Sequence, residues 1–174
     1  MVDTEKKIVV ERMNVEYKGI FSVKDMINDL KRNAEELGYT RTAKEDTYET
    51  VTPESRSARI ELRLQKAKFD YMQFLIKVII NLNNMREITT TIDGKKVKLD
   101  QGEANIHFMS FIITEMKGHW TSRRPTYYFF KGLKEKFINI KEKLMYDAEL
   151  ANDTKILQKN LKAHLNLYKY RVEE

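Results

Sequence analysis

The hydrophobic pattern of the first forty residues has two parts, one with the period of a strand and one with the period of a helix. Residues 8–18 carry apolar side chains at alternate positions, which predicts a strand that Gly19 ends. Ser22–Leu37 then repeats apolar residues at helical spacing, and Gly38 is suited to terminate a helix. The chain is therefore expected to open with one strand and one helix.

The next eighty residues follow a period of two, which is typical of strands. Turn signals divide this region at Pro53–Ser57, Asn83-Asn84, Asp93-Gly94 and Asp100-Gln101-Gly102. Asp-Gly favours a tight hairpin turn, because both central positions need a positive φ. The expected strands cover 39–52, 58–65, 69–82, 85–92, the segment around Val97 and Leu99, and 103–116.

The last third of the chain is predicted to be helical. Pro125 suits a helix start, and an apolar seam follows at spacings of three and four residues: Phe130, Leu133, Phe137, Ile140 and Leu144. A single helix from Thr126 to Tyr170 would be roughly 67 Å long, about twice the width of a small domain. We therefore expect a domain at 1–150 and, after a break near Asn152-Asp153-Thr154, a helical tail at 151–174.

These elements predict an α+β fold in which a single twisted antiparallel sheet of six or seven strands wraps on a long C-terminal helix. Over residues 8–150, this order resembles the START-like (SRPBCC, helix-grip) superfamily, although one helix rather than two follows the first strand. The resemblance implies a cavity for an apolar ligand, and our first hypothesis is therefore a non-enzymatic binding protein that holds an apolar or amphipathic small ligand between sheet and helix. The implied cavity would be lined by Phe74, Ile76, Val78, Phe108, Ser110, Ile112, Tyr127, Phe130, Leu133 and Phe137. The alternative is a filled core, since facing Phe, Ile and Leu side chains usually close the space between two layers.

The composition of the 174 residues narrows the possible chemistry. The chain has no cysteine, which excludes disulfides, thiolate metal sites and a cysteine nucleophile. The three histidines, His107, His119 and His164, have no metal-ligand spacing, and the six glycines form no phosphate-binding loop. No cofactor is expected. A small enzyme on this scaffold is a further alternative, with His119 and Tyr127 as its first candidates. The charged N-terminus and the lack of a long apolar run predict a cytoplasmic protein without a membrane span.

Charge is concentrated in one segment. Lys117–Lys143 carries eight lysines and arginines against two glutamates, which accounts for the whole net charge of +6. Guanidinium groups bind phosphates and aromatic rings stack on bases, so this basic strip predicts an anionic partner, and the alternative function is that of an RNA- or ribonucleoprotein-associated protein. Its candidate contacts are Lys117, His119, Trp120, Arg123, Arg124, Tyr128, Lys131, Lys134 and Lys141. The alternative is a solvated basic helix with Trp120 closing one end of the core.

The tail carries a second apolar stripe, formed by Leu157, Leu161, Leu165 and Tyr168. A stripe of this kind has to be covered. Either it packs back on the domain, or it contacts a second copy or another protein, and a homodimer is the simplest closed arrangement.

Overall fold

The fold was obtained as a computed structural model, which describes residues 3–41, 46–51, 56–69, 72–92, 95–116 and 139–172. The chain forms β1 (Asp3–Phe21), α1 (Val23–Glu36), β2 (Thr40–Arg41), β3 (Asp46–Val51), β4 (Arg56–Phe69), β5 (Met72–Ile92), β6 (Lys95–Met116) and α3 (Asn139–Val172). Four long strands run in the order β1-β6-β5-β4, and the short β2 and β3 both pair with β4. All of these pairings are antiparallel. The predicted α+β class, with one antiparallel sheet and a C-terminal helix, is confirmed.

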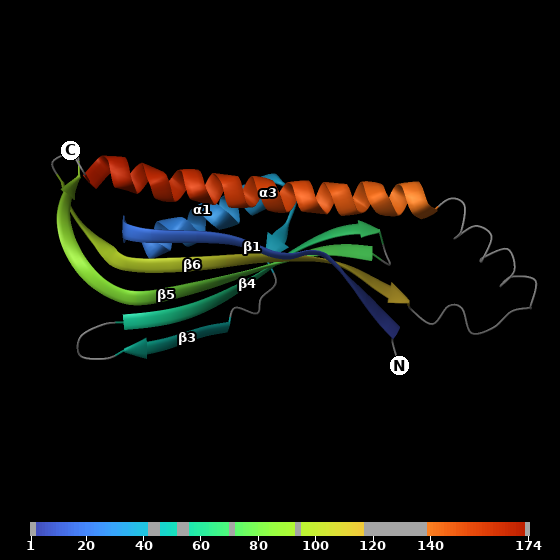
Figure 1. The fold of residues 1–174 in the computed structure, drawn as a ribbon, viewed down its shortest axis with the longest axis horizontal. Helices are drawn as coiled ribbons and strands as arrows, with labels where there is room; N and C mark the ends of the chain where they lie inside the picture. Colours follow the sequence, from blue (N-terminus) through green and yellow to red (C-terminus); the bar gives the residue numbers. More distant parts are fainter. Residues whose placement is uncertain are drawn as a thin grey trace, which may run out of the picture.

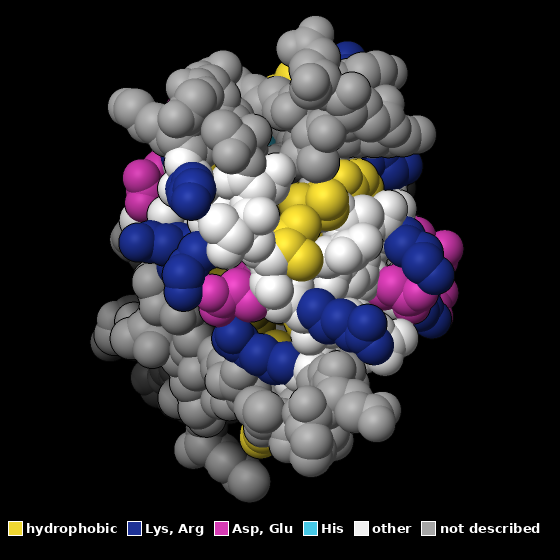
Figure 2. Space-filling view, turned by 90° about the vertical axis from the view of Figure 1, so that its left-hand side faces the viewer, with side chains coloured by type: hydrophobic (Ala, Val, Ile, Leu, Met, Phe, Trp, Pro, Cys, Tyr) yellow, Lys and Arg dark blue, Asp and Glu magenta, His cyan; other side chains and the backbone are white. Residues whose placement is uncertain are grey.

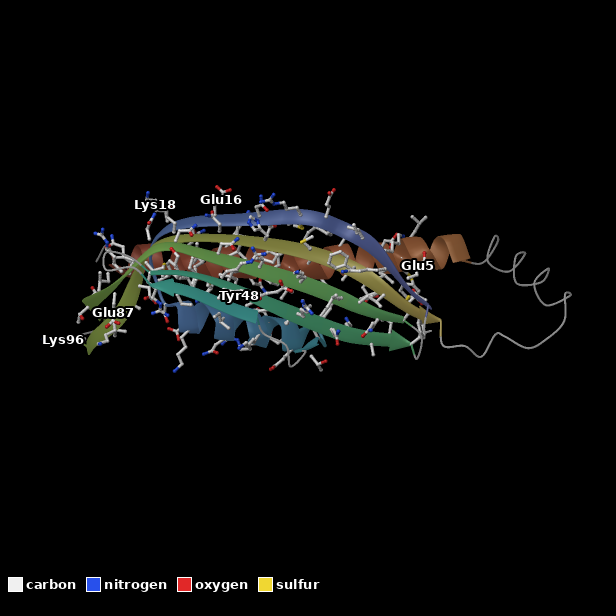
Figure 3. All side chains as sticks on the ribbon, turned by 90° about the horizontal axis from the view of Figure 1, so that it is seen from below. Glu5, Glu16, Lys18, Tyr48, Glu87 and Lys96 are labelled. Atoms are coloured by element: carbon white, nitrogen blue, oxygen red, sulfur yellow. The ribbon has the colours of Figure 1, made fainter. Side chains whose placement is uncertain are left out.

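The two described helices, α1 and α3, lie on the same face of the sheet, and no described residue forms a helix on the opposite face (Figures 1 and 3). The helix α1 begins as predicted, because the Ser22 hydroxyl accepts a hydrogen bond from the Asp25 backbone N–H at 3.2 Å. It ends before Gly38, whose φ of 83° favours a residue without a Cβ. The buried side of α1 carries Met26, Leu30 and Ala34.

The expected division into six or seven strands is not the one found, because two of the predicted turns lie inside long strands. The predicted turn at Asn83-Asn84 is an irregularity within β5, where pairing moves from Asn83–Glu103 to Arg86–Gln101. The predicted turn at 100–102 is part of β6, and Gly102 pairs with Gly19 of β1. Bulges and glycines bend strands as well as ending them. Here they line up across three neighbouring strands, where β5 and β6 curve sharply (Figure 1).

The helix α3 is continuous through Asn152-Asp153-Thr154, so the predicted break is wrong. Its 34 residues span about 51 Å. A helix of this length fits the domain because the strands are also long. β5 has 21 residues and β6 has 22, and at about 3.3 Å per residue both are long enough to lie alongside α3. The sheet is elongated, whereas the prediction assumed a domain of ordinary width.

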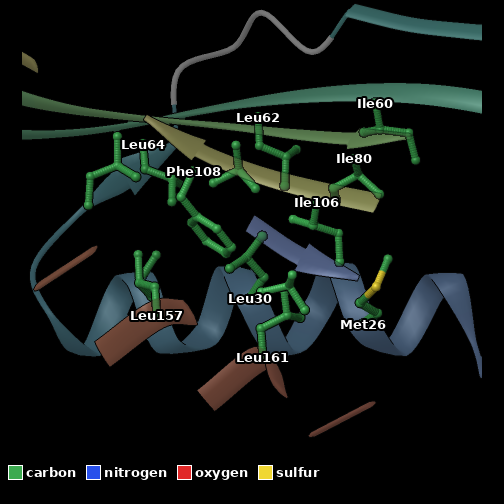
Figure 4. Packing of buried hydrophobic residues seen from close by; sticks show 14 of the residues in the cluster. Met26, Leu30, Ile60, Leu62, Leu64, Ile80, Ile106, Phe108, Leu157 and Leu161 are labelled. Atoms are coloured by element: carbon green, nitrogen blue, oxygen red, sulfur yellow. The ribbon is translucent and has the colours of Figure 1, made fainter. Parts of the chain in front are cut away.

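The hydrophobic core of the described residues lies between the sheet and the helices α1 and α3. In Figure 4, Leu157 and Leu161 of α3 and Leu30 of α1 point toward Leu62 and Phe108 of the sheet. All five of these side chains are at most 2% exposed. The core therefore uses the part of α3 that the sequence assigned to a separate tail.

Candidate functional site

Six of the ten residues predicted to line a cavity lie together on the helix-facing side of β5 and β6. Three cross-strand pairs contain all of them: Phe74–Ile112, Ile76–Ser110 and Val78–Phe108. Ile112 is 7% exposed, and the other five side chains are fully buried. The predicted strand positions are thus part of the core. The four predicted helix positions, Tyr127, Phe130, Leu133 and Phe137, lie outside the described residues.

Among the described helix residues, those that cover this part of the sheet do not include Leu144. Leu144, the last residue of the predicted seam, is 62% exposed. Tyr146 covers the strands instead, and its ring centroid lies 6.3 Å from that of Phe74 and 5.9 Å from that of Phe69. Leu150 follows one turn later and is fully buried. Leu144 was therefore wrongly placed on the buried side of the helix, where Tyr146 and Leu150 lie instead, and the rest of the predicted seam lies outside the side chains that the structure describes.

Ser110 is a polar side chain in this apolar layer without a hydrogen-bond partner among the described residues. Its side chain is fully buried, and its Oγ makes no hydrogen bond to them. Thr154 of α3, which is equally buried, donates its hydroxyl proton to the Leu150 carbonyl at 2.7 Å. A buried hydroxyl without a partner costs about 1–3 kcal/mol. Ser110 is therefore a position at which a bound molecule with a hydrogen-bonding group would stabilise the protein.

The strand beside Ser110 is irregular. Val10 of β1 pairs with Ser110, and the register of β1 against β6 shifts on both sides of Val10, between Ile8 and Val10 and between Val10 and Met13. Such bulges disrupt the ladder locally and are frequent next to functional sites. The unpartnered hydroxyl thus lies at the most irregular point of the β1–β6 pairing.

A second polar atom without a described partner lies at this end of the helix–sheet layer. Asp147 of α3 pairs through Oδ2 with Lys7 of β1, whereas its Oδ1 is buried and makes no hydrogen bond to the described residues. Lys7 is in register with Ile112, two residues along β6 from Ser110. Ser110 and Asp147 thus present, from opposite layers and near the same end of the core, two oxygen atoms that make no hydrogen bond to the described residues.

The other edge of this layer is closed by a buried polar cluster. The Tyr39 hydroxyl donates to Asp153 Oδ2 at 2.9 Å, and Lys66 Nζ lies 3.5 Å from both Asp153 Oδ2 and Glu149 Oε1. Lys68 also pairs with Glu149. Burial raises the pKa of Tyr39, and the Asp153 carboxylate raises it further. Tyr39 therefore stays protonated and acts as a donor that fastens α3 to the sheet edge, and not as a base.

Apolar side chains are exposed at the end of the molecule where α3 begins. Leu144 is 62% exposed, Met145 is 59% exposed, and Phe69 at the end of β4 is 45% exposed. The Phe69–Tyr146 ring contact joins the end of β4 to the first half of α3, and both segments lie in the right half of Figure 1. An apolar ligand would find apolar surface here, next to the buried Phe74–Ile112 pair.

The described histidines take part in polar contacts rather than a metal site. His107, on the face of the sheet away from the helices, lies 2.8 Å from the Asn14 side-chain oxygen, and burial followed by the Arg12 charge lowers its pKa. His164 of α3 lies 3.6 Å from Asp29 of α1. His119 is outside the described residues, within which no group of three metal-binding side chains occurs.

The predicted basic strip falls almost wholly outside the described residues. This applies to Lys117, His119, Trp120, Arg123, Arg124, Tyr128, Lys131 and Lys134. Lys141 lies in α3, but its side chain is not described. The hypothesis of an anionic partner at this strip stays a prediction from sequence.

The stripe predicted to form a homodimer belongs to the core of a single copy. Leu157, Leu161 and Leu165 are at most 1% exposed, so packing back on the domain is the alternative found, and a dimer through these three leucines is not compatible with this fold. The Tyr168 side chain is not described.

The sequence analysis also missed the polar cluster around Asp153, because it placed a helix break there. The signal for a continuous helix was the spacing of Leu150, Thr154, Leu157 and Leu161, which keeps one side of the helix buried on both sides of the predicted break.

The described helices include none that is long and apolar enough to cross a membrane. Comparison of the chain with protein-family models, with curated proteins and with solved structures finds no match.

Proposed function

We propose that this protein is a non-enzymatic binding protein that holds a small, mainly apolar molecule between its sheet and α3, next to Ser110. The observation that carries the proposal is the buried Ser110 hydroxyl, which has no hydrogen-bond partner among the described residues. A ligand with one hydrogen-bonding group would satisfy this hydroxyl, while its apolar part would contact Ile76 and Ile112. Entry would be from the end at which Leu144, Met145 and Phe69 are exposed.

The order of the elements supports the same proposal. The last strand, β6, lies between the first strand and β5, and a long C-terminal helix lies across the sheet. This arrangement is in keeping with the START-like resemblance, in which a curved sheet and a C-terminal helix enclose a ligand. Because a fold by itself does not determine function, the argument depends on Ser110 and its surroundings.

The proposal is tested with two ligands that differ by one hydroxyl group, p-cresol and toluene. Isothermal titration calorimetry should give tighter binding of p-cresol, by about fivefold, the value of one neutral buried hydrogen bond. Ser110→Ala should remove this preference. Thr154→Val is the matched control, because it deletes a buried hydroxyl that already has a partner, and it should leave the preference unchanged.

Two results would count against the proposal. The first is that neither compound binds at millimolar concentration, and the second is that p-cresol keeps its advantage in Ser110→Ala. Native mass spectrometry of the purified protein provides an independent measurement, since a retained ligand should add a discrete mass that Ser110→Ala reduces.

A further inference from the structure

A hollow lies at the bent end of the sheet, away from the proposed ligand site. Its volume is about 520 Å³, and it is open to solvent. Its lining comes from three adjacent strands: Lys18, Gly19, Asn84, Arg86, Gln101, Gly102 and Glu103. Figure 2 views the molecule from this end, where lysine and arginine side chains lie beside acidic ones, and Figure 3 labels Lys18 there.

The backbone is irregular beside the hollow. Gly19 of β1 and Gly102 of β6 are direct partners, and the space at each is already occupied, by the Tyr17 ring at Gly19 and by Met85 and the Asn83 carbonyl at Gly102. A Cβ on Gly102 would come within 2.9 Å of the Asn83 carbonyl oxygen, and this close approach requires glycine. In β5, Asn84 has a φ of 53°, and pairing passes directly from Asn83 to Arg86. The backbone of Asn84 thus lies outside the regular ladder and beside the hollow.

The charged side chains that line the hollow differ in whether they form an ion pair with another described residue. Lys18 Nζ lies 2.7 Å from Glu103 Oε1, so the one acidic group of the lining already has a cation. Arg86 is exposed and forms no ion pair with any other described residue. The nearby Lys98 on β6 pairs with Glu87 at 2.7 Å. Within the described part of the chain, Arg86 is consequently the cation of the lining that has no ion-pair partner.

We propose that this hollow is a binding site for a small oxyanion, a carboxylate or a phosphate. The Arg86 guanidinium offers two parallel N–H donors to the two oxygens of such a group. The side-chain amides of Asn84 and Gln101 supply further donors from the two facing strands. Lys18 holds Glu103 and so limits its repulsion of the anion. This site is independent of the ligand site at Ser110.

The test is a titration of the wild-type chain with sodium phosphate and, separately, sodium acetate, followed by amide NMR at constant ionic strength. Amide signals of residues 84–86 and 101–103 should shift and saturate, and the tighter of the two anions identifies the oxyanion class. Arg86→Gln should weaken binding about tenfold, since charge-assisted hydrogen bonds contribute about 1.5–3 kcal/mol. Lys98→Gln, which removes an exposed cation of the same hairpin, should change the affinity by less than about twofold.

The proposal is overturned if neither anion shifts these amides at tens of millimolar. It is equally overturned if Lys98→Gln weakens binding as much as Arg86→Gln, because the response would then reflect general surface charge. Amide spectra of both variants should match the wild type outside the hairpin, which shows that each variant is folded.

Discussion

The replacement Leu161→Ala tests the finding that the distal half of α3 belongs to the core. Leu161 is 1% exposed and packs in the cluster that includes Leu30 of α1 and Phe108 of β6. Removing a buried leucine side chain costs about 2–5 kcal/mol, which combines the lost transfer energy with the cavity left behind. For a domain of this length each kcal/mol lowers the Tm by about 2–4 °C, so a loss near 3 kcal/mol corresponds to about 6–12 °C.

The assay is urea unfolding followed by circular dichroism, with Leu167→Ala as the matched control. Leu167 lies on the same helix and is 56% exposed, so its replacement should change the free energy of unfolding by no more than about 0.5 kcal/mol. Equal small effects of the two variants would refute the placement of α3, because a projecting tail would tolerate both. Equal large effects would show that the buried side of the helix has been misidentified.

Three further predictions concern other parts of the fold. Tyr39→Phe should lower the free energy of unfolding by about 1.5–3 kcal/mol at pH 7, because Asp153 loses a hydrogen bond in a buried cluster. Folding raises the pKa of Tyr39 above its usual value of 10.0, so the free energy of unfolding of the wild type should fall as the pH rises past about 10. The difference in this free energy between the wild type and Tyr39→Phe should then shrink, and a constant difference in urea titrations at alkaline pH would contradict the reasoning. Gly102→Ala should destabilise by about 1–3 kcal/mol, because its Cβ would meet Met85 and the Asn83 carbonyl, and an unchanged Tm would argue against the bend. Ser110→Ala without ligand should leave stability unchanged or raise it, whereas Thr154→Val should lower it by about 1 kcal/mol; the reverse order in chemical denaturation would mean that Ser110 has a partner.

Local sequence signals that have only one structural interpretation predicted elements of the fold correctly. The cap at Ser22 and the glycine at position 38 fixed the limits of α1, and the hairpin on either side of Asp93-Gly94 pairs up to Ile92 and Lys95 as expected. The alternation along residues 58–65 and 103–116 placed the buried positions of β4 and β6 on the correct face. These features depend on neighbours in sequence, which is why the pattern alone was sufficient.

Signals with two physical meanings were misinterpreted. Asn83-Asn84 and Gly102 are compatible with a turn or with a bulge, and only their alignment with Gly19 across the sheet distinguishes the two. Asp153 and Thr154 are typical of a helix start, but here Tyr39 and the Leu150 carbonyl provide partners that let them stay inside a helix. These partners come from the tertiary structure or from the helix itself, and the local pattern does not reveal them.

The candidate site was predicted in part for the same reason. The period of two along β5 and β6 grouped Phe74, Ile76, Ser110 and Ile112 on one face, which the structure has. That Ser110 lacks a described hydrogen-bond partner could not be foreseen, because it depends on which groups of β1 and α3 approach it. The choice between a filled core and a ligand site likewise depends on this three-dimensional environment.

The central claim, a ligand beside Ser110, is tested most directly by intermolecular nuclear Overhauser effects from bound p-cresol to the methyl groups of the protein. The account predicts contacts from the ligand to Val10, Ile76 and Ile112, the neighbours of Ser110 in the sheet. Contacts confined to exposed side chains such as Leu167 and Val97, or no contacts at saturating p-cresol, would contradict it.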